Sequence, residues 1–417
     1  MSRVITYGTF DLLHYGHKRL LERAKQLGDY LIVGVTSDDF DRRRGKINTH
    51  QSLMERIAAI RALGIADEII VEEYVGQKID DIKRYDIDIF TVGSDWEGKF
   101  DYLKEYCTVI YLPRTEGVSS SEIRAEKADI KIGIVGESGV AKKFAKECEF
   151  VNGVQAVDAE DTDAVYIISQ PEDHYADIRH ALLEGRHVIC ESPISTTKDQ
   201  CVELQKLAKN KKLVLMDGIK PAYATAYSRL LLLIKSGAIG EVVSVDATCT
   251  SLGDKGYGKG AVKGKWNSIC AWGPTALLPV FQILGVNYSS RHIYSTYVDN
   301  SKLYDGFTKI DFVYSNAVAS IKVAKAAKSE GSLVITGTEG YIYVPAPWWK
   351  TDYFEIRYED AENNKRYFYQ LDGEGIRYEI VAFSKSIETG KDFSYISEEV
   401  SREIANCIEA CMYGKEM

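Results

Sequence analysis

The chain has 417 residues, 45% of them hydrophobic, and this length predicts two or three domains with ordinary cores. Its formal net charge of −9 argues against a general binder of nucleic acid or of membrane surfaces, although local basic pockets for phosphates are compatible with it. We therefore expect small molecules as partners, with no nucleic acid and no membrane among them.

The targeting and redox features predict a cytoplasmic protein. The chain opens with a strand instead of a basic and apolar leader, and it has no apolar run long enough to span a membrane. The eight cysteines are scattered without a C-x-x-C pair, and Cys407 and Cys411 have the spacing of one helix face. We expect reduced thiols and no structural zinc.

The first distinctive feature is an apolar strand followed by the glycine-containing turn 7–17 and a helical pattern from Lys18. Gly8 allows a backbone to pass close to a phosphate. His14 and His17 stand three residues apart at a helix start, where both imidazoles can face one anionic ligand and the helix dipole adds to the attraction. The alternative is that the two histidines only solvate or cap the turn. The first interpretation suits transfer of a nucleotide from a triphosphate.

Strands and helices alternate through residues 1–128, which predicts a parallel α/β domain. Further short buried strands are expected at residues 31–35, 68–71, 89–92 and 109–112. The basic run 42–46 is either a solvated charge cluster or a clamp for phosphates. Ser119 and Glu122 form a capping box, and a capped helix start is also an anion site.

Several motifs in this region together resemble one family in their order and spacing. They are the turn 7–17, Lys46, the segment 93–101 and the segment 114–121. This set is similar to the signature of the glycerol-3-phosphate cytidylyltransferase family, and the similarity covers residues 1–128. It implies a Rossmann-like nucleotidyltransferase domain that transfers CMP from CTP to a polyol phosphate and releases pyrophosphate.

The same resemblance implies roles for individual residues. His14 and His17 would contact the triphosphate, Lys46 would clamp phosphates, and Asp11 would lie near Mg²⁺ bound with CTP. The positions implied to complete the nucleotide site are Gly8, Thr9, Phe10, Asp95, Arg114, Ser119, Ser120 and Ser121. Ser94 stands where the family commonly has a second aspartate, and this departure concerns the acceptor.

A charged segment, 125–129, ends the first region, and a new strand is expected at 130–135. The next residues, 136–141, imitate the G-x-G-x-x-A loop that binds dinucleotides at a helix start, and a lone motif of this kind is weakly specific. Gly136 and Gly139 are its candidate cofactor-binding residues.

Later segments give this loop a context. Residues 163–171 with His174, and residues 185–193 with Glu191, resemble the nicotinamide-dependent glucose-fructose oxidoreductase and inositol dehydrogenase family. The resemblance implies a Rossmann-like domain over residues 130–219 that binds NAD(P)H, with Glu191 near the cofactor.

The resemblance continues to the C-terminus. The segment 234–242 is similar to the family's entry into its second domain, and 335–342 to its late hairpin. Period-two patterning at 308–314 and 317–323 predicts an open antiparallel sheet in an α+β domain over residues 220–417. Residues 396–413 are expected to form a final amphipathic helix.

The active-site positions of this second region depart from the family. Ser138 replaces the middle glycine of the loop, and the short separation between Gly136 and Asp163 indicates that a βα unit is deleted. Asp158 is either the ribose-binding carboxylate or a solvated loop residue. The usual lysine, aspartate and histidine positions of the family are occupied by Ser192, Ala271 and Thr275.

Two interpretations of the second region remain open. In the first it is a reductase whose proton donor is Lys220 or Tyr223, with burial lowering the pKa of Lys220. In the second it keeps the fold, has lost redox chemistry, and acts as a scaffold or regulatory domain. A surface role for Lys220 is the corresponding alternative for that residue alone.

The sequence as a whole predicts a bifunctional enzyme. It would make a CDP-polyol from CTP and a polyol phosphate, and its second half would reduce a ketose or aldose phosphate to that acceptor. We expect a homodimer or higher homo-oligomer. A nucleotide sensor without turnover is the alternative class, and pyrophosphate release would discriminate the two.

Overall fold

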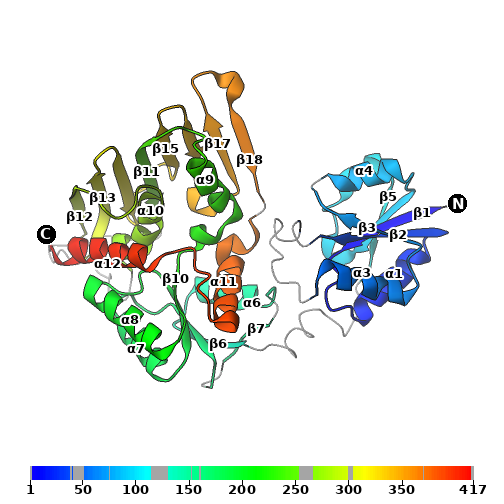
Figure 1. Cartoon of the computed structure of the whole chain (residues 1–417), viewed down its shortest axis with the longest axis horizontal. Coiled ribbons are helices and arrows are strands. Elements are labelled where there is room, and N and C mark those ends of the chain that lie inside the picture. Colours follow the sequence, from blue (N-terminus) through cyan, green and yellow to red (C-terminus); the bar gives the residue numbers. More distant parts are fainter. Residues whose placement is uncertain are drawn as a thin grey trace. The chain divides into compact units, whose positions relative to one another are not determined.

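The computed structural model describes residues 2–37, 40, 51–74, 76–113, 130–151, 153–158, 161–252, 266–298, 304–369 and 371–414. The chain separates into two compact units (Figure 1). We call Met1–Asp129 with Glu149–Val154 the N-terminal unit, and Ile130–Cys148 with Gln155–Met417 the C-terminal unit.

The N-terminal unit is built on a parallel sheet with strand order β3-β2-β1-β4-β5. Its strands are β1 (Arg3–Gly8), β2 (Tyr30–Thr36), β3 (Glu68–Glu72), β4 (Ile89–Gly93) and β5 (Thr108–Leu112). All five were expected from the apolar runs, and the parallel α/β prediction is confirmed. The apolar runs of these strands are nearly continuous because helices cover both faces of the sheet.

Helices lie on both faces of this sheet (Figure 1). They are α1 (Tyr15–Lys25), α3 (Leu53–Leu63) and α4 (Gln77–Arg84), with 3₁₀ turns η1 (Ser94–Trp96) and η2 (Asp101–Glu105). Leu21 of α1 and Ile60 of α3 join one core cluster, and Ile82 of α4 joins the cluster on the opposite face. The helix α1 begins at Tyr15, before the expected Lys18, so His17 lies within its first turn.

The C-terminal unit begins with a second sheet, of order β10-β9-β8-β6-β7. Its strands are β6 (Ile130–Val135), β7 (Val154–Ala156), β8 (Ala164–Ile167), β9 (His187–Glu191) and β10 (Leu215–Gly218). The helices α7 (His174–Leu183) and α8 (Lys198–Lys211) cover one face. On the other face α6 (Gly139–Cys148) packs against α11 (Ile376–Thr389), and Phe144 of α6 stacks on Tyr166 of β8 with ring centroids 3.8 Å apart.

The predicted deletion of a βα unit is borne out by this sheet. Only residues 157–163 connect β7 to β8, which is too short for the crossover helix and further strand of a complete dinucleotide-binding half. The strand β7 itself has three residues. Asp158 lies just beyond β7 and is exposed.

A mixed sheet of order β12-β13-β14-β11-β15-β16-β17-β18 forms the rest of the unit. The strands are β11 (Val242–Thr250), β12 (Ser290–Tyr297), β13 (Asp305–Val313), β14 (Val318–Ala324), β15 (Leu333–Gly337), β16 (Tyr341–Val344), β17 (Tyr353–Arg357) and β18 (Lys365–Phe368). The expected all-antiparallel sheet is wrong at one pair, because β11 and β14 are parallel. Period-two patterning fixes which side chains share a face but not strand direction, and here α10 (Ser268–Leu284), β12 and β13 lie between β11 and β14 in the chain.

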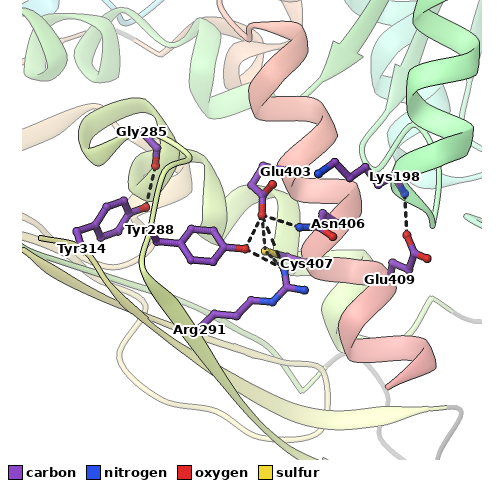
Figure 2. A network of polar contacts seen from close by, with 9 residues as sticks. All are labelled: Lys198, Gly285, Tyr288, Arg291, Tyr314, Glu403, Asn406, Cys407 and Glu409. Carbon is purple, nitrogen blue, oxygen red and sulfur yellow. Dashed lines mark hydrogen bonds and ion pairs between the residues drawn. The ribbon is translucent and has the colours of Figure 1, made fainter. Parts of the chain in front are cut away.

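The final helix α12 (Glu398–Tyr413) lies between the two sheets of the C-terminal unit, packed against α8 and α10. Figure 2 shows its polar contacts: Glu403 accepts hydrogen bonds from the hydroxyl of Tyr288, at 2.6 Å, and from the amide of Asn406, at 2.9 Å. Glu409 accepts from the backbone N–H of Lys198 at the start of α8, at 2.9 Å. The expected terminal helix is confirmed, and it ties α8 to the mixed sheet.

Among the described residues, no helix is both long enough and apolar enough to cross a membrane.

Candidate active sites

The turn after β1 lies where the order of the N-terminal sheet reverses. The chain leaves β1 toward β2 on one side, whereas β4 and β5 continue on the other side. In open parallel sheets, ligands bind at the carboxyl ends of the strands at such a point. His14 and His17 follow β1, and Asp95, in η1, follows β4, so the topology brings these residues to the same sheet edge.

The two histidines are stacked at the start of α1. His14 is the N-cap residue, and its ring lies parallel to that of His17, with centroids 3.8 Å apart and 24° between the ring planes. The first-turn N–H groups of α1 and its dipole favour an anion at this end of the helix. Imidazole N–H groups placed here can donate to phosphate oxygens.

Phe10 packs against His17, and Gly8 leaves room for the Phe10 ring. The ring of Phe10 is 2% exposed and meets the ring of His17 edge-on, with centroids 5.5 Å apart. A Cβ on Gly8 would lie 2.9 Å from the Phe10 ring, so the glycine is needed for this packing. Phe10 was expected among the nucleotide-binding residues; its side chain lies in the core, where its ring contacts that of His17.

A buried arginine that the sequence analysis missed ties the site loops together. Arg56 of α3 is fully buried, and its Nη1 donates to the carbonyls of Thr9, at 2.7 Å, and Thr36, at 2.9 Å. Its Nε donates to the carbonyl of Gln51 at 3.2 Å. Arg56 lies three residues after Leu53 and four before Ile60, on the apolar face of α3. A charged residue at a core-facing position was the signal for it.

Asp11 lies in the same loop. Its Oδ1 accepts a hydrogen bond from the backbone N–H of Gln51 at 3.0 Å, and Leu12 N–H donates to the Gln51 side chain at 3.0 Å. Five expected site residues, Lys46, Arg114, Ser119, Ser120 and Ser121, lie outside the described residues, as do the basic run 42–46 and the capping box.

The C-terminal unit contains a cavity of about 500 Å³ at the carboxyl ends of β8, β9 and β10. Its wall includes Ser138 of the dinucleotide-like loop, Glu191, and Lys220 of the 3₁₀ turn η3 (Lys220–Tyr223). Three tryptophans, Trp266, Trp272 and Trp349, also line it. The cavity is therefore aromatic, with a few charged groups.

The loop between β6 and α6 is shaped as the motif predicts at its first glycine. Gly136 has φ +104°, and a Cβ there would lie 2.7 Å from the backbone of Ile168 and Ser169. Ser138 accepts from the backbone N–H of Ala141 at 3.0 Å, so it caps the helix where the family has a glycine. Gly139 begins α6 with open space beside it.

Glu191 and Lys220 form a pair in the cavity wall. Glu191 Oε1 accepts from the hydroxyl of Tyr166 at 2.6 Å and lies 3.7 Å from Lys220 Nζ. Burial by itself lowers the pKa of Lys220, but the carboxyl groups of Glu191, Glu379 and Glu374 outweigh it and leave the pKa above its usual value. The expected lowering of this pKa is therefore wrong, because the acidic neighbours stabilise the ammonium. The side chain lines the cavity wall and is 24% exposed.

The positions that depart from the family all lie in this cavity. Ser192, Ala271 and Thr275 line its wall together with Lys220. Tyr223, the other proton donor considered, is 2% exposed and does not line the cavity. The structure thus leaves Lys220 as the cationic group next to Glu191.

Two regions of the chain match different families of known proteins. Residues 5–126 match the family model described as cytidylyltransferase-like. Glycerol-3-phosphate cytidylyltransferase of Bacillus spizizenii is 53% identical over 130 residues, which are 31% of this chain and 100% of that protein.

The chain belongs to the cytidylyltransferase family.

An oxidoreductase-family domain follows the cytidylyltransferase region. Residues 119–219 match the model described as oxidoreductase family, NAD-binding Rossmann fold. A dTDP-3,4-didehydro-2,6-dideoxy-α-D-glucose 3-reductase of Streptomyces antibioticus is 36% identical over 113 residues, 26% of this chain and 34% of that protein. The structure of KijD10, a 3-ketoreductase from Actinomadura kijaniata in complex with NADP and TDP-benzene, has a TM-score of 0.58 and 16% identity. It covers 67% of this chain and 96% of that one, and at this identity it shows the fold alone.

The protein is therefore an enzyme of the cytidylyltransferase family that carries an oxidoreductase-family domain. In the cytidylyltransferase unit, Asp11 is suited to Mg²⁺, which proteins usually hold through one or two carboxylates together with phosphate oxygens. The described residues contain no group of three or more metal-binding side chains, and an ion bound in that way does not need one.

Proposed function

We propose that the N-terminal unit transfers CMP from CTP to a polyol phosphate, giving a CDP-polyol and pyrophosphate. The observation that carries this proposal is the stacked pair His14 and His17 at the start of α1, beside the end of β4 with Asp95. The 53% identity to a complete glycerol-3-phosphate cytidylyltransferase supports glycerol phosphate as the acceptor class.

The chemistry requires no enzyme nucleophile. An oxygen of the acceptor's phosphate forms a bond to the α-phosphorus of CTP, and the bond from that phosphorus to the bridging oxygen of pyrophosphate breaks. His14 and His17 would donate hydrogen bonds to the phosphate oxygens on which charge develops. Arg56 would keep the Thr9 loop in place by donating to the carbonyl of Thr9. The remaining phosphates would be held by Lys46, Arg114, Ser119 and Ser120. Mg²⁺ near Asp11 would neutralise charge on the phosphates.

We further propose that the C-terminal unit reduces a ketose or aldose phosphate to the polyol phosphate that the first unit uses. The residues present fit a dinucleotide at its pyrophosphate and nicotinamide parts: Gly136 permits close backbone approach, and the cavity lies at the strand ends next to it. Gly139 and Glu191 would contribute to the same site. A reduced nicotinamide would supply a hydride to the substrate's carbonyl carbon.

Lys220 would supply the proton in this reduction. Its ammonium is held beside Glu191 in the cavity wall, where it can donate to a carbonyl oxygen that gains charge. The three tryptophans would cover the faces of a cofactor ring or of a sugar. This assignment relocates the family's proton donor from position 192 to the neighbouring strand end.

A second function is favoured by specific observations. Ser192, Ala271 and Thr275 give the cavity none of the family's usual acid groups, and the sheet lacks the elements after β7 that complete an adenosine site. In this alternative the C-terminal unit is a scaffold or regulatory domain without redox activity.

Two assays test these proposals. Purified protein with CTP, Mg²⁺ and a panel of polyol phosphates should release pyrophosphate with at least one acceptor; CTP binding without release would instead indicate a nucleotide sensor. For the second unit, NADH and NADPH oxidation is followed with ketose and aldose phosphates in wild type, Lys220→Met and the exposed control Lys235→Met.

Saturable oxidation that is lost only in Lys220→Met supports the reductase. Absence of cofactor binding at millimolar concentration would overturn it in favour of the scaffold. The domain limits we propose are 1–128, 130–219 and 220–417.

A further inference from the structure

A buried carboxyl group lies behind the Glu191–Lys220 pair, outside the cavity wall. Glu379, in the first turn of α11, is 1% exposed. Among the residues that the structure describes, no group donates a hydrogen bond to its Oε1. A buried carboxylate with an oxygen that no group donates to is disfavoured, and the group avoids the cost by holding a proton.

The start of α11 is pressed against Lys220. Gly375, the N-cap residue of α11, has φ +94°, and a Cβ there would lie 2.5 Å from the carbonyl oxygen of Lys220. Helix α11 also packs on α6 and on η3, and Arg377 pairs with Glu147 of α6 at 2.9 Å. Glu379 therefore lies on a helix that packs against the turn carrying Lys220.

Charged groups of three neighbouring elements act on Glu379. Glu191 of β9, Asp217 of β10 and Lys220 of η3 act on it electrostatically, and Tyr166 of β8 and Tyr223 of η3 also face it. Burial and the neighbouring carboxyl of Glu191 raise the pKa of Glu379 well above its usual range, against the opposing effect of Lys220. One ammonium can balance one carboxylate, and Glu191 is the carboxylate it contacts.

We propose that Glu379 is a proton store for the cavity: it holds a carboxylic-acid proton at neutral pH and gives it up when Lys220 has passed its own proton to a substrate, so that Lys220 regains one. The role as a store rests on the proposed reductase function, whereas the protonated state and its coupling to Lys220 do not.

The step balances in protons and electrons. Reduction of a carbonyl consumes one hydride, which carries both electrons, and one proton, which Lys220 gives to the oxygen. The neutral amine of Lys220 then regains a proton at the expense of Glu379, and the Glu379 carboxylate takes one from solvent. Glu379 does not touch the substrate, so it is a positioning residue for the proton and not a catalytic residue.

Infrared spectroscopy at pH 8 tests the protonated state in the full chain without any ligand. Wild type should show the C=O stretch of a buried carboxylic acid, Glu379→Gln should lose it, and Glu388→Gln, an exposed position on the same helix, should keep it. Asp217 does not interfere, because its pKa of about 6 leaves it ionised at pH 8. Identical bands in wild type and Glu379→Gln would overturn the proposal.

The Lys220→Met variant tests coupling and covers the case in which Glu379→Gln does not fold. Removal of the ammonium leaves Glu191 without its counter-charge, so the carboxylic-acid band at pH 8 should grow. An unchanged or smaller band would contradict the coupling.

Turnover then tests the role as a store. In Glu379→Gln, the first turnover of reduced nicotinamide should keep its wild-type rate, because Lys220 starts protonated, while steady-state turnover should fall tenfold or more. Loss of the first turnover, or an unchanged steady state, would overturn it. If wild type itself oxidises no cofactor, the reductase proposal fails, and the infrared comparison alone decides whether Glu379 is protonated and coupled to Lys220.

Discussion

The imidazole rings of His14 and His17 stack with centroids 3.8 Å apart at the N-terminus of α1. The positive end of the helix dipole and the N–H groups of the two rings all favour an anion at this helix start. The two histidines occupy different positions of the turn, so each can be tested separately. Substitution of either histidine, or of the residue that holds the neighbouring loop, should therefore have a measurable effect.

His14→Ala and His17→Ala should each lower cytidylyl transfer by roughly a hundredfold or more, the scale of losing one preorganised donor at a developing charge. Pyrophosphate release with CTP and an accepted polyol phosphate measures this. Lys18→Ala, on the same helix and half-exposed, is the control and should stay near wild type. Near-normal turnover by a folded double variant would remove the pair from the mechanism.

Arg56→Met should lower the free energy of unfolding of the N-terminal unit by about 2–4 kcal/mol, since three carbonyls, one of them buried and two partly buried, lose their donor. Transfer activity should fall with it, because the Thr9 loop is no longer held. Denaturant unfolding followed by circular dichroism gives the midpoint. Arg61→Met, exposed on the same helix, is the control, and equal midpoints for both variants would show that the carbonyl contacts carry no stability.

Residues 1–128 expressed alone should remain a cytidylyltransferase, because every motif of that family lies before the 125–129 segment. Pyrophosphate release with the acceptors that the full chain uses is the measurement. A fragment that folds but releases none would indicate that the two units share a site, and the proposed limit would be wrong.

The raised pKa of Asp217 should make the stability of the C-terminal unit depend on pH. Burial raises its pKa to about 6 from the ordinary 3.8, so the folded state binds this proton more tightly than the unfolded chain does. Its stabilising contribution is complete below pH 3.8 and is lost as pH rises through 6. At pH 8 the ionised group costs up to about 3 kcal/mol, from the shift of roughly two pKa units.

Asp217→Asn should therefore raise the unfolding free energy at pH 8 by up to about 3 kcal/mol relative to wild type, and by little at pH 4. Tryptophan fluorescence reports mainly this unit, because four of the five tryptophans, Trp266, Trp272, Trp348 and Trp349, belong to it. A difference between variant and wild type that does not change from pH 4 to pH 8 would contradict the assignment.

The sequence by itself determined the features that depend on local pattern. Apolar runs identified every strand of the N-terminal sheet, and the spacing between Gly136 and Asp163 was enough to infer the missing βα unit, because a strand and crossover helix need a minimum length of chain. The turn 7–17 placed both histidines at a helix start, since glycine turns and helix starts have short-range signals.

Only the tertiary structure decided the features that depend on residues far apart in the chain. The pKa of Lys220 was expected to fall through burial, and it rises chiefly because the fold places Glu191 of β9 3.7 Å from its ammonium, with Glu379 of α11 and Glu374 adding to the effect. Likewise Arg56 reads as one charge in an amphipathic helix until the fold brings Thr9 and Thr36 to its guanidinium. Desolvation and Coulomb interactions act over distances in space, and sequence spacing does not contain those distances.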